Sequence, residues 1–237
     1  MTPIGEHTTV RTLVGRLDFA EVDPTSAALV VIDLQRLCAG ADGEHADKAR
    51  ELGRWGDIAA YFERVSDVVV PNVRRLADAA RQAGATVIYV RCRSLTPDAR
   101  DNGRRFHDFG IAVPCDSPEA ELIDGLELQE GDLLLDKTTA SAFLSTNLDV
   151  LLRQLGVRSL ITTGVVTSGC VESTVRDACD LDYEVLLVED ACADRTPQLH
   201  EDTMRRLHNN FAVGVTTRTA LSALGAPATL EGSASGR

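Results

Sequence analysis

The sequence predicts an α/β fold, a three-layer domain in which a six-stranded, mainly parallel sheet carries helices on both faces. Short apolar runs alternate with stretches of helical periodicity along most of the chain, and the runs are almost wholly apolar. A strand that exposed one face to water would instead alternate apolar and polar residues. Strands of this composition are buried on both faces, as in parallel sheets covered by helices.

Length and composition agree with one globular domain. The chain has 237 residues, of which 44% are hydrophobic and 25% are charged, which is enough for a large core. We expect an N-terminal extension over residues 1–25, a single domain over 26–225 and a small, polar, flexible tail over 226–237.

The charge balance disfavours several kinds of partner. Lys and Arg total 24 and Asp and Glu total 36, so the net charge is −12. Such a chain repels nucleic acid and anionic membrane surfaces. No apolar run approaches the roughly 20 residues of a membrane-spanning helix, and the first residues lack a secretory signal pattern. The six cysteines show no CxxC spacing, so we expect a cytoplasmic protein with reduced thiols.

The apolar runs place the strands, and helical periodicity places the helices between them. The predicted strands cover residues 27–32, 86–90, 133–135, 160–163, 184–188 and 211–215. The predicted helices cover residues 57–83, 146–155, 170–182, 197–209 and 218–224. The first of these helices ends at Gly84, and the segment 92–131, which contains three prolines, is expected to be irregular.

Chemistry in a parallel sheet collects at the carboxyl ends of the strands. Five features lie there: Asp33, Cys92, Arg93, Lys137 and the segment 164–170. That segment has the spacing G-x-x-x-x-G of a phosphate-binding loop. It continues with Cys170 and valine instead of lysine and a hydroxyl residue, which argues against a nucleotide.

Cys170 lies in the first turn of a predicted helix. Free backbone N–H groups and the positive helix end favour a thiolate there, and the same N–H groups suit an oxyanion. Asp33 would accept the thiol proton, and the Lys137 ammonium would stabilise negative charge. The alternatives are a small buried thiol, a turn-capping carboxylate and a surface lysine.

Three segments together resemble the isochorismatase-like cysteine hydrolases. These segments are Val31–Gln35, Asp136–Phe143 and Thr163–Ala178, and the resemblance extends from about residue 26 to about residue 216. It implies a six-stranded parallel sheet and an Asp–Lys–Cys triad. In that triad Cys170 is the nucleophile, Asp33 is the general base and then the acid, and Lys137 orients and stabilises.

The resemblance further implies an oxyanion hole formed by the backbone N–H groups of Val166 and Cys170, and a cis peptide bond between Val165 and Val166. The implied reaction hydrolyses a non-peptide C–N bond. A thioester forms, ammonia or an amine leaves, and water releases the acid. The relatives also imply a homo-oligomer, a dimer or a tetramer.

Two details of the sequence indicate which branch of the family the chain resembles. The segment 90–94 lacks the histidine of metal-binding relatives, so we expect no metal and no other cofactor. The presence of Cys170 favours amides over vinyl ethers. We therefore expect a small carbamoyl, ureido or amide substrate, as in hydrolases of N-carbamoylsarcosine, ureidoacrylate or biuret. The alternatives are a lactam or vinyl-ether hydrolase on the same scaffold and a non-catalytic binding protein.

Further side chains are candidates for contact with the substrate. The predicted substrate-binding residues are Gln35, Arg93, Phe143, Val165 and Thr167. A guanidinium such as that of Arg93 suits a substrate carboxylate or carbonyl. The alternatives are a solvated loop arginine, a turn-capping glutamine and a core phenylalanine.

Overall fold

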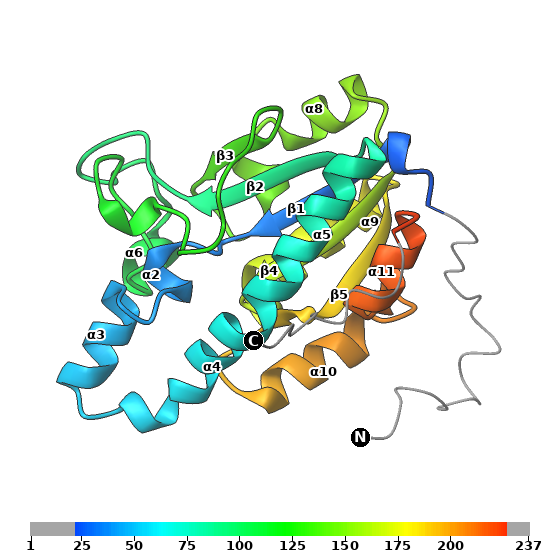
Figure 1. Cartoon of the computed structure of the whole chain (residues 1–237). Helices are drawn as coiled ribbons and strands as arrows, with labels where there is room; N and C mark the ends of the chain where they lie inside the picture. The colour runs from blue at the N-terminus through cyan, green and yellow to red at the C-terminus, as the bar shows by residue number, and fades with distance from the viewer. Residues whose placement is uncertain (1–21, 227–237) are drawn as a thin grey trace, which may run out of the picture.

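The computed structural model describes residues 22–226 and shows a six-stranded sheet between two layers of helices (Figure 1). The strands are β1 (Ala27–Ile32), β2 (Thr86–Cys92), β3 (Leu133–Lys137), β4 (Ser159–Val165), β5 (Glu184–Ala193) and β6 (Val213–Val215). They lie in the order β3-β2-β1-β4-β5-β6, and each neighbouring pair is parallel. The predicted fold class is confirmed.

Strand β1 explains why the apolar runs do not alternate with polar residues. All six of its residues are buried. Leu29 and Val31 pack into the core on one face of the sheet, whereas Ala28, Val30 and Ile32 pack into the core on the other face. Both faces of a central parallel strand therefore need apolar side chains.

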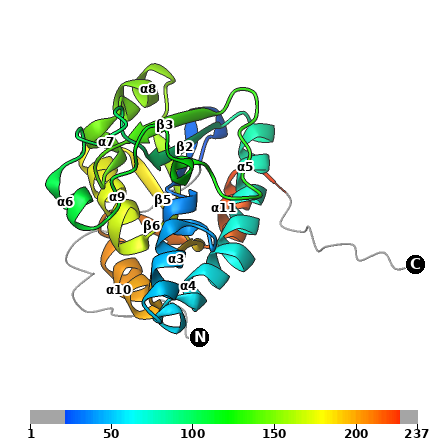
Figure 2. The ribbon, with the colours of Figure 1, turned by 90° about the vertical axis from the view of Figure 1, so that its left-hand side faces the viewer.

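Each face of the sheet is covered by its own helices, as the end-on view shows (Figure 2). Helices α4 (Ala59–Arg64), α5 (Val70–Ala83) and α11 (Thr217–Ala223) pack on one face. Helices α8 (Leu148–Gln154), α9 (Glu172–Asp180) and α10 (Pro197–Leu207) pack on the other. Among residues 22–226, no helix combines the length and the apolar character needed to cross a membrane.

The predicted helix over 57–83 is interrupted. The 3₁₀ turn η2 (Trp55–Asp57) and helix α4 lead into a π-helical turn, η3 (Val65–Val69), and α5 follows. Pro71 at the start of α5 has no N–H group to donate, so the regular hydrogen-bond ladder fails there. Gly84 ends α5 in the left-handed conformation, as expected of a C-terminal glycine.

Several boundaries differ from the prediction. Strand β3 reaches Lys137, and β5 continues to Ala193, five residues beyond its predicted end. The polar Glu189 and Asp190 lie within the observed strand, and the Asp190 carboxylate accepts a hydrogen bond from the Thr217 N–H at the start of α11. The sequence also left short helices unpredicted: α2 (Arg36–Ala39), α3 (Glu44–Glu51), α6 (Arg104–Asp108) and α7 (Ala142–Ser145). The predicted extension and tail fall almost entirely outside the described residues.

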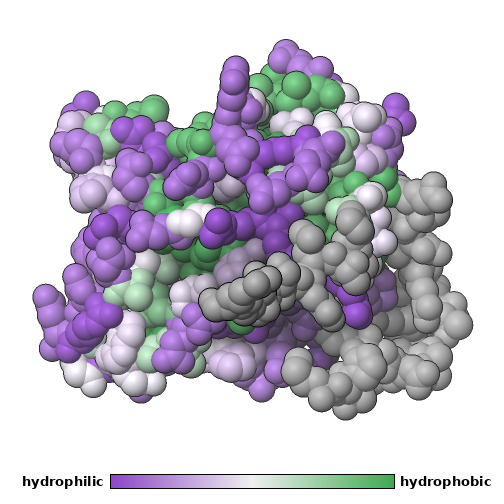
Figure 3. All heavy atoms as spheres, viewed as in Figure 1, coloured by the Kyte–Doolittle hydropathy of each residue, from purple (hydrophilic) through white to green (hydrophobic). Residues whose placement is uncertain are grey.

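The carboxyl ends of β1 and β2 point toward α2, α3 and α6, which lie together at one end of the sheet (Figure 1). The remaining short elements are η1 (Pro24–Ser26), η4 (Pro118–Ala120) and η5 (Thr167–Val171). On the face seen in Figure 1, hydrophilic side chains predominate, with smaller hydrophobic areas between them (Figure 3). The polar residues predicted at the strand ends thus lie close to these short helices.

Gly164 allows β1 and β4 to approach closely. Its φ is +115°, and a Cβ atom there would lie 2.0 Å from the backbone oxygen of Ile32. Since that oxygen belongs to the central strand, it cannot move away without disturbing the sheet. Any side chain at position 164 would separate the two strands that lead to Asp33 and Cys170.

We expect Gly164→Ala to lower the free energy of unfolding by at least about 2 kcal/mol, because steric clash adds to backbone strain. Gly53→Ala is the matched control. Gly53 also has a positive φ, +66°, but a Cβ there meets nothing within 4 Å, so its cost should stay near about 1 kcal/mol. Urea denaturation measures both, and equal losses would contradict the close-packing argument.

Candidate active site

Asp33 occupies the turn directly after β1. Its φ is +53°, a conformation that aspartate tolerates better than most residues, and its N–H donates to the Val90 carbonyl at 2.8 Å. Only 2% of the residue is exposed. The turn thus fixes a buried carboxylate at the carboxyl edge of the sheet.

Lys137, the last residue of β3, is fully buried and reaches this carboxylate. Its Nζ lies 2.8 Å from Asp33 Oδ2 and donates to the Thr139 carbonyl at 3.1 Å. Burial by itself would lower the pKa of the lysine. The charge of Asp33 and the neighbouring thiols outweigh burial, so the pKa lies well above its usual value and Lys137 remains an ammonium.

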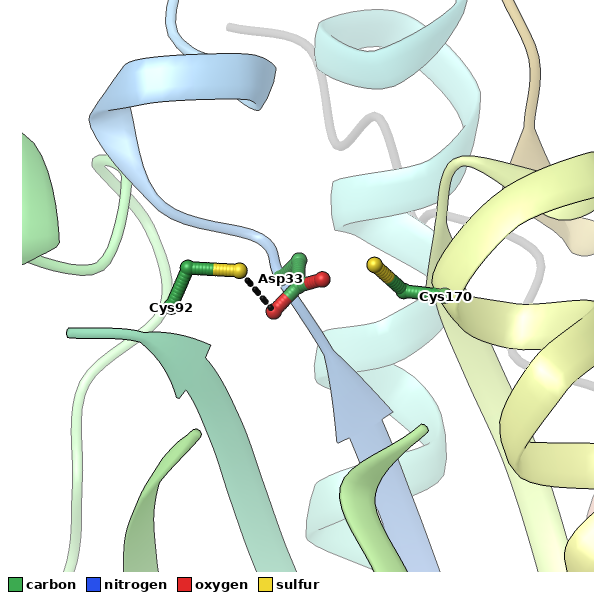
Figure 4. A group of neighbouring side chains, drawn as sticks. All are labelled: Asp33, Cys92 and Cys170. Carbon is green, nitrogen blue, oxygen red and sulfur yellow. Dashed lines mark hydrogen bonds between the residues drawn. The ribbon is translucent and has the colours of Figure 1, made fainter. Parts of the chain in front are cut away.

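Cys170 enters from the turn η5, directly beyond β4. The Lys137 ammonium donates to its Sγ at 3.3 Å. The structure therefore brings together Asp33, Lys137 and Cys170, which come from the ends of three strands and lie far apart in the sequence. In Figure 4 the side chains of Asp33 and Cys170 point toward one another.

Cys92 supplies a fourth polar group. It ends β2, is buried, and accepts a hydrogen bond from Lys137 Nζ at 3.1 Å. Its thiol donates to Asp33 Oδ1 at 3.5 Å, the contact dashed in Figure 4. Hydrogen bonding to Cys170, burial and the charge of Asp33 raise the pKa of Cys92 well above its usual range. Cys92 therefore stays a neutral thiol.

The donor set does not suit a metal ion. Asp33, Cys92 and Cys170 offer atoms that lie within 4.8 Å of one another. However, the Lys137 ammonium lies within 3.3 Å of an atom of each of them. A positive charge already occupies the position from which a cation would be bound, so a second cation would be repelled.

The loop that carries Cys170 is held by two side chains, Asp194 directly after β5 and His200 in α10. The peptide bond between Val165 and Val166 is cis, as the family resemblance implies. Next to it, the Ser168 N–H donates to Asp194 at 2.6 Å, and the Thr167 hydroxyl shares a hydrogen bond with His200 Nδ1 at 2.8 Å. Sequence reasoning gave no role to Asp194 or His200, because neither belongs to a motif.

A cavity of about 190 Å³ opens above these groups. Asp33, Cys92 and Cys170 contribute to its polar end. Its apolar wall is formed by Leu37, Phe106, Phe109 and Ile111. Three cationic or titratable side chains also line it: His45, Arg105 and Arg195. A small molecule with a polar reacting group and a negative charge would meet complementary groups here.

Arg195 is the cation best placed to hold a ligand. Within residues 22–226, its side chain has no hydrogen-bond or ion-pair partner, whereas Arg105 lies over the Phe109 ring at 5.7 Å. Arg195 follows the carboxyl end of β5. The sequence pattern gave no sign of Arg195, because the predicted strand ended five residues before the end of β5.

Most of the predicted substrate-binding side chains lie elsewhere. Val165 lines the cavity, but Arg93 does not: its guanidinium pairs with Asp136 at 3.1 Å and donates to the Cys115 carbonyl. Phe143 stacks on Tyr183, with ring centroids 5.8 Å apart. The prediction that Arg93 and Phe143 face the cavity is therefore corrected. Each side chain contacts another residue of the protein and does not line the cavity.

Thr167 and Gln35 also have structural contacts in place of the expected ones. Thr167 is fully buried against His200. Gln35 is fully buried, and its amide donates to the carbonyls of Cys92 at 2.9 Å and Glu119 at 3.0 Å. Both support the walls of the site from outside the cavity.

Comparison with known proteins agrees with this geometry. Residues 27–219 match the model of the isochorismatase domain. The ureidoacrylate amidohydrolase RutB of Pantoea ananatis is 30% identical over 204 residues, which is 79% of this chain and 77% of that protein.

Two crystal structures are similar in fold and sequence. A cysteine hydrolase from Pseudomonas syringae has a TM-score of 0.73 at 25% identity, covering 90% of this chain and 98% of that one. The N-carbamoylsarcosine amidase of Thermoplasma acidophilum has a TM-score of 0.61 at 25% identity, covering 81% and 96%. The chain belongs to the isochorismatase family and is a hydrolase of the amidohydrolase class, the enzymes that cleave linear amide C–N bonds.

His200 should make stability depend on pH. Burial lowers its pKa to about 4, from 6.5 for an ordinary histidine. Below pH 6.5 the histidine of the unfolded chain binds a proton, whereas the buried His200 of the folded chain stays neutral. The free energy of unfolding therefore falls as the pH drops toward 4. We expect His200→Gln to reduce that loss by up to about 3 kcal/mol.

Urea denaturation at pH 7 and pH 4.5 measures this difference. His107→Gln, a change at an exposed histidine, is the control and should leave the loss as it is in the unmodified protein. An equal loss in the unmodified protein and in His200→Gln would contradict the assignment.

Proposed function

We propose that this chain is a cysteine amidohydrolase that cleaves the C–N bond of a small carbamoyl, ureido or amide compound through a thioester and releases ammonia. The observation that carries the proposal is the contact of 3.3 Å between the Lys137 ammonium and Cys170 Sγ, beside the Asp33 carboxylate. A fixed positive charge next to a thiol stabilises the thiolate, which is the nucleophilic form.

The first half of the reaction forms the thioester. Asp33 accepts the proton of Cys170, and the sulfur attacks the carbonyl carbon of the substrate. The backbone N–H groups of Val166 and Cys170 are proposed to hold the oxyanion, and the Lys137 charge stabilises the negative charge around it. Asp33 then returns the proton to the nitrogen, the C–N bond breaks, and ammonia leaves.

The second half releases the acid. Water enters where ammonia left, Asp33 accepts one of its protons, and the oxygen attacks the thioester carbon. The C–S bond breaks and Cys170 regains its proton from Asp33. Overall, one amide and one water give one acid and one ammonia, and the enzyme returns to its starting state.

The charges around the cavity support a substrate that also carries a carboxylate. Arg195 is an exposed guanidinium that lines the cavity, and Arg105 and His45 line it as well. A guanidinium binds a carboxylate through paired hydrogen bonds. Ureidoacrylate, for which the bacterial relative is named, combines a ureido group with a carboxylate. We propose a ureido or carbamoyl acid of this kind.

Hydrolysis of a lactam or a vinyl ether, and ligand binding without catalysis, are alternatives that the same fold allows. The half-buried Cys170 thiol beside an ammonium favours covalent chemistry over binding alone. The homo-oligomeric state and the cytoplasmic location remain predictions.

Cys170→Ala should reduce ammonia release from ureido and carbamoyl acids at least about a thousandfold, because no nucleophile remains. Asp33→Asn should have a similar effect, since an amide cannot accept the proton. Cys179→Ala removes a half-buried thiol on α9 and should keep full activity. Substantial turnover by Cys170→Ala would reject the mechanism. Product formation with addition of water but no ammonia would instead indicate lactam opening.

Arg195→Met should raise KM about tenfold or more for a ureido acid, because a charge-assisted hydrogen bond is lost. A neutral primary amide of the same size should show little change. Arg100→Met, at an exposed arginine paired with Asp98, is the matched control. Equal effects of Arg195→Met on the acid and the neutral amide would argue against a carboxylate subsite.

A further inference from the structure

The triad leaves the Cys92 thiol without an assigned role, although it contacts Lys137 and Asp33 and lies beside Cys170. Its Sγ lies 3.1 Å from Lys137 Nζ and 3.5 Å from Asp33 Oδ1. Figure 4 shows the Asp33 carboxylate lying between the side chains of Cys92 and Cys170. The Nζ atom of Lys137 lies 2.8 Å from the other carboxylate oxygen, Oδ2. Each oxygen of Asp33 therefore has its own donor.

The Gln35 side chain fixes the backbone of Cys92. The Gln35 side chain accepts a hydrogen bond from the Cys92 N–H and donates one to the Cys92 carbonyl at 2.9 Å. Because Gln35 follows Asp33 by two residues, this pair of bonds ties the turn after β1 to the end of β2. The distance between the thiol and the carboxylate is thereby set by the backbone.

We propose that Cys92 is a positioning residue for Asp33: its thiol donates to Oδ1, accepts from Lys137, and keeps the carboxylate directed toward Cys170. The proposal rests on the proposed function, in which Asp33 is the base. A neutral thiol can donate and accept at once, which a carboxylate or an ammonium at this position could not do. The raised pKa of Cys92 agrees with that neutral form.

Removal of the thiol should change the proton affinity of Asp33. A hydrogen bond donated to a carboxylate favours its charged form, so losing the donor makes Asp33 easier to protonate. The remaining ionisable groups of the cavity would still be present in these variants: Cys38, His45, Arg105, Lys137, Cys170 and Arg195. We therefore expect the acid limb of the pH profile to move to higher pH.

Two variants remove the donor and one retains it. Cys92→Ala and Cys92→Val leave no donor, and valine also fills the space and suits the end of a strand. Cys92→Ser keeps an O–H donor of similar size. Cys192→Ala, at a fully buried thiol in β5, controls for deletion of a buried sulfur. Circular dichroism establishes which variants fold.

The test measures kcat/KM for a ureido acid against pH, together with the rate at which iodoacetamide alkylates Cys170, followed by mass spectrometry. Cys92→Ala and Cys92→Val should lower kcat about tenfold and move the acid limb upward by about half to one pH unit in both measurements. Cys92→Ser and Cys192→Ala should remain within about twofold, with the limb unmoved.

Alkylation needs no substrate, so the two proposals can fail separately. A shifted alkylation profile without any ammonia release would overturn the proposed function and leave the role of Cys92 standing. Acid limbs that coincide in the unmodified protein and in either folded variant without a donor would overturn that role. It would equally be overturned if Cys92→Ser shifted as far as Cys92→Val.

Discussion

The buried ion pair between Asp33 and Lys137 is the interaction on which the rest of this site depends. The two charged atoms lie 2.8 Å apart, and both side chains are almost completely shielded from water. Loss of either partner would leave an uncompensated buried charge, which typically costs 3–5 kcal/mol. Because the pair is satisfied by further hydrogen bonds to Cys92 and Thr139, it can remain charged in this setting. It thereby supplies a base and a fixed cation at one point.

The order of strands explains how residues so far apart in the sequence reach that point. Strand β1 is central, β2 and β4 flank it, and β3 lies beyond β2. Their carboxyl ends share one edge, so Asp33, Cys92 and the loop of Cys170 lie side by side. The long side chain of Lys137 spans the remaining distance from β3. The same topology leaves the edge open for short helices and loops to form the cavity wall.

The sequence predicted the sheet from its apolar runs and placed Asp33, Lys137 and Cys170 near their ends, while the family resemblance implied that these three residues form a triad. The predicted strand boundaries are wrong where polar residues continue a strand. The Glu189 and Asp190 pair concealed the true end of β5, and with it Arg195. Arg93 is predicted to contact the substrate because it lies near a strand end, but its guanidinium forms an ion pair with Asp136 on the adjacent strand. Such pairing depends on strand register, which composition does not specify.

Catalysis at this site requires Cys170 to form a covalent bond with the substrate carbonyl. Rapid acid quenching of the enzyme during turnover of a ureido acid, followed by peptide mass spectrometry, would detect that bond. We expect a thioester adduct on the peptide that carries Cys170, absent from the peptides that carry Cys38 and Cys92 and lost when turnover is complete. Sustained ammonia release with Cys170 unmodified at every quench time, or an adduct on another thiol alone, would contradict it.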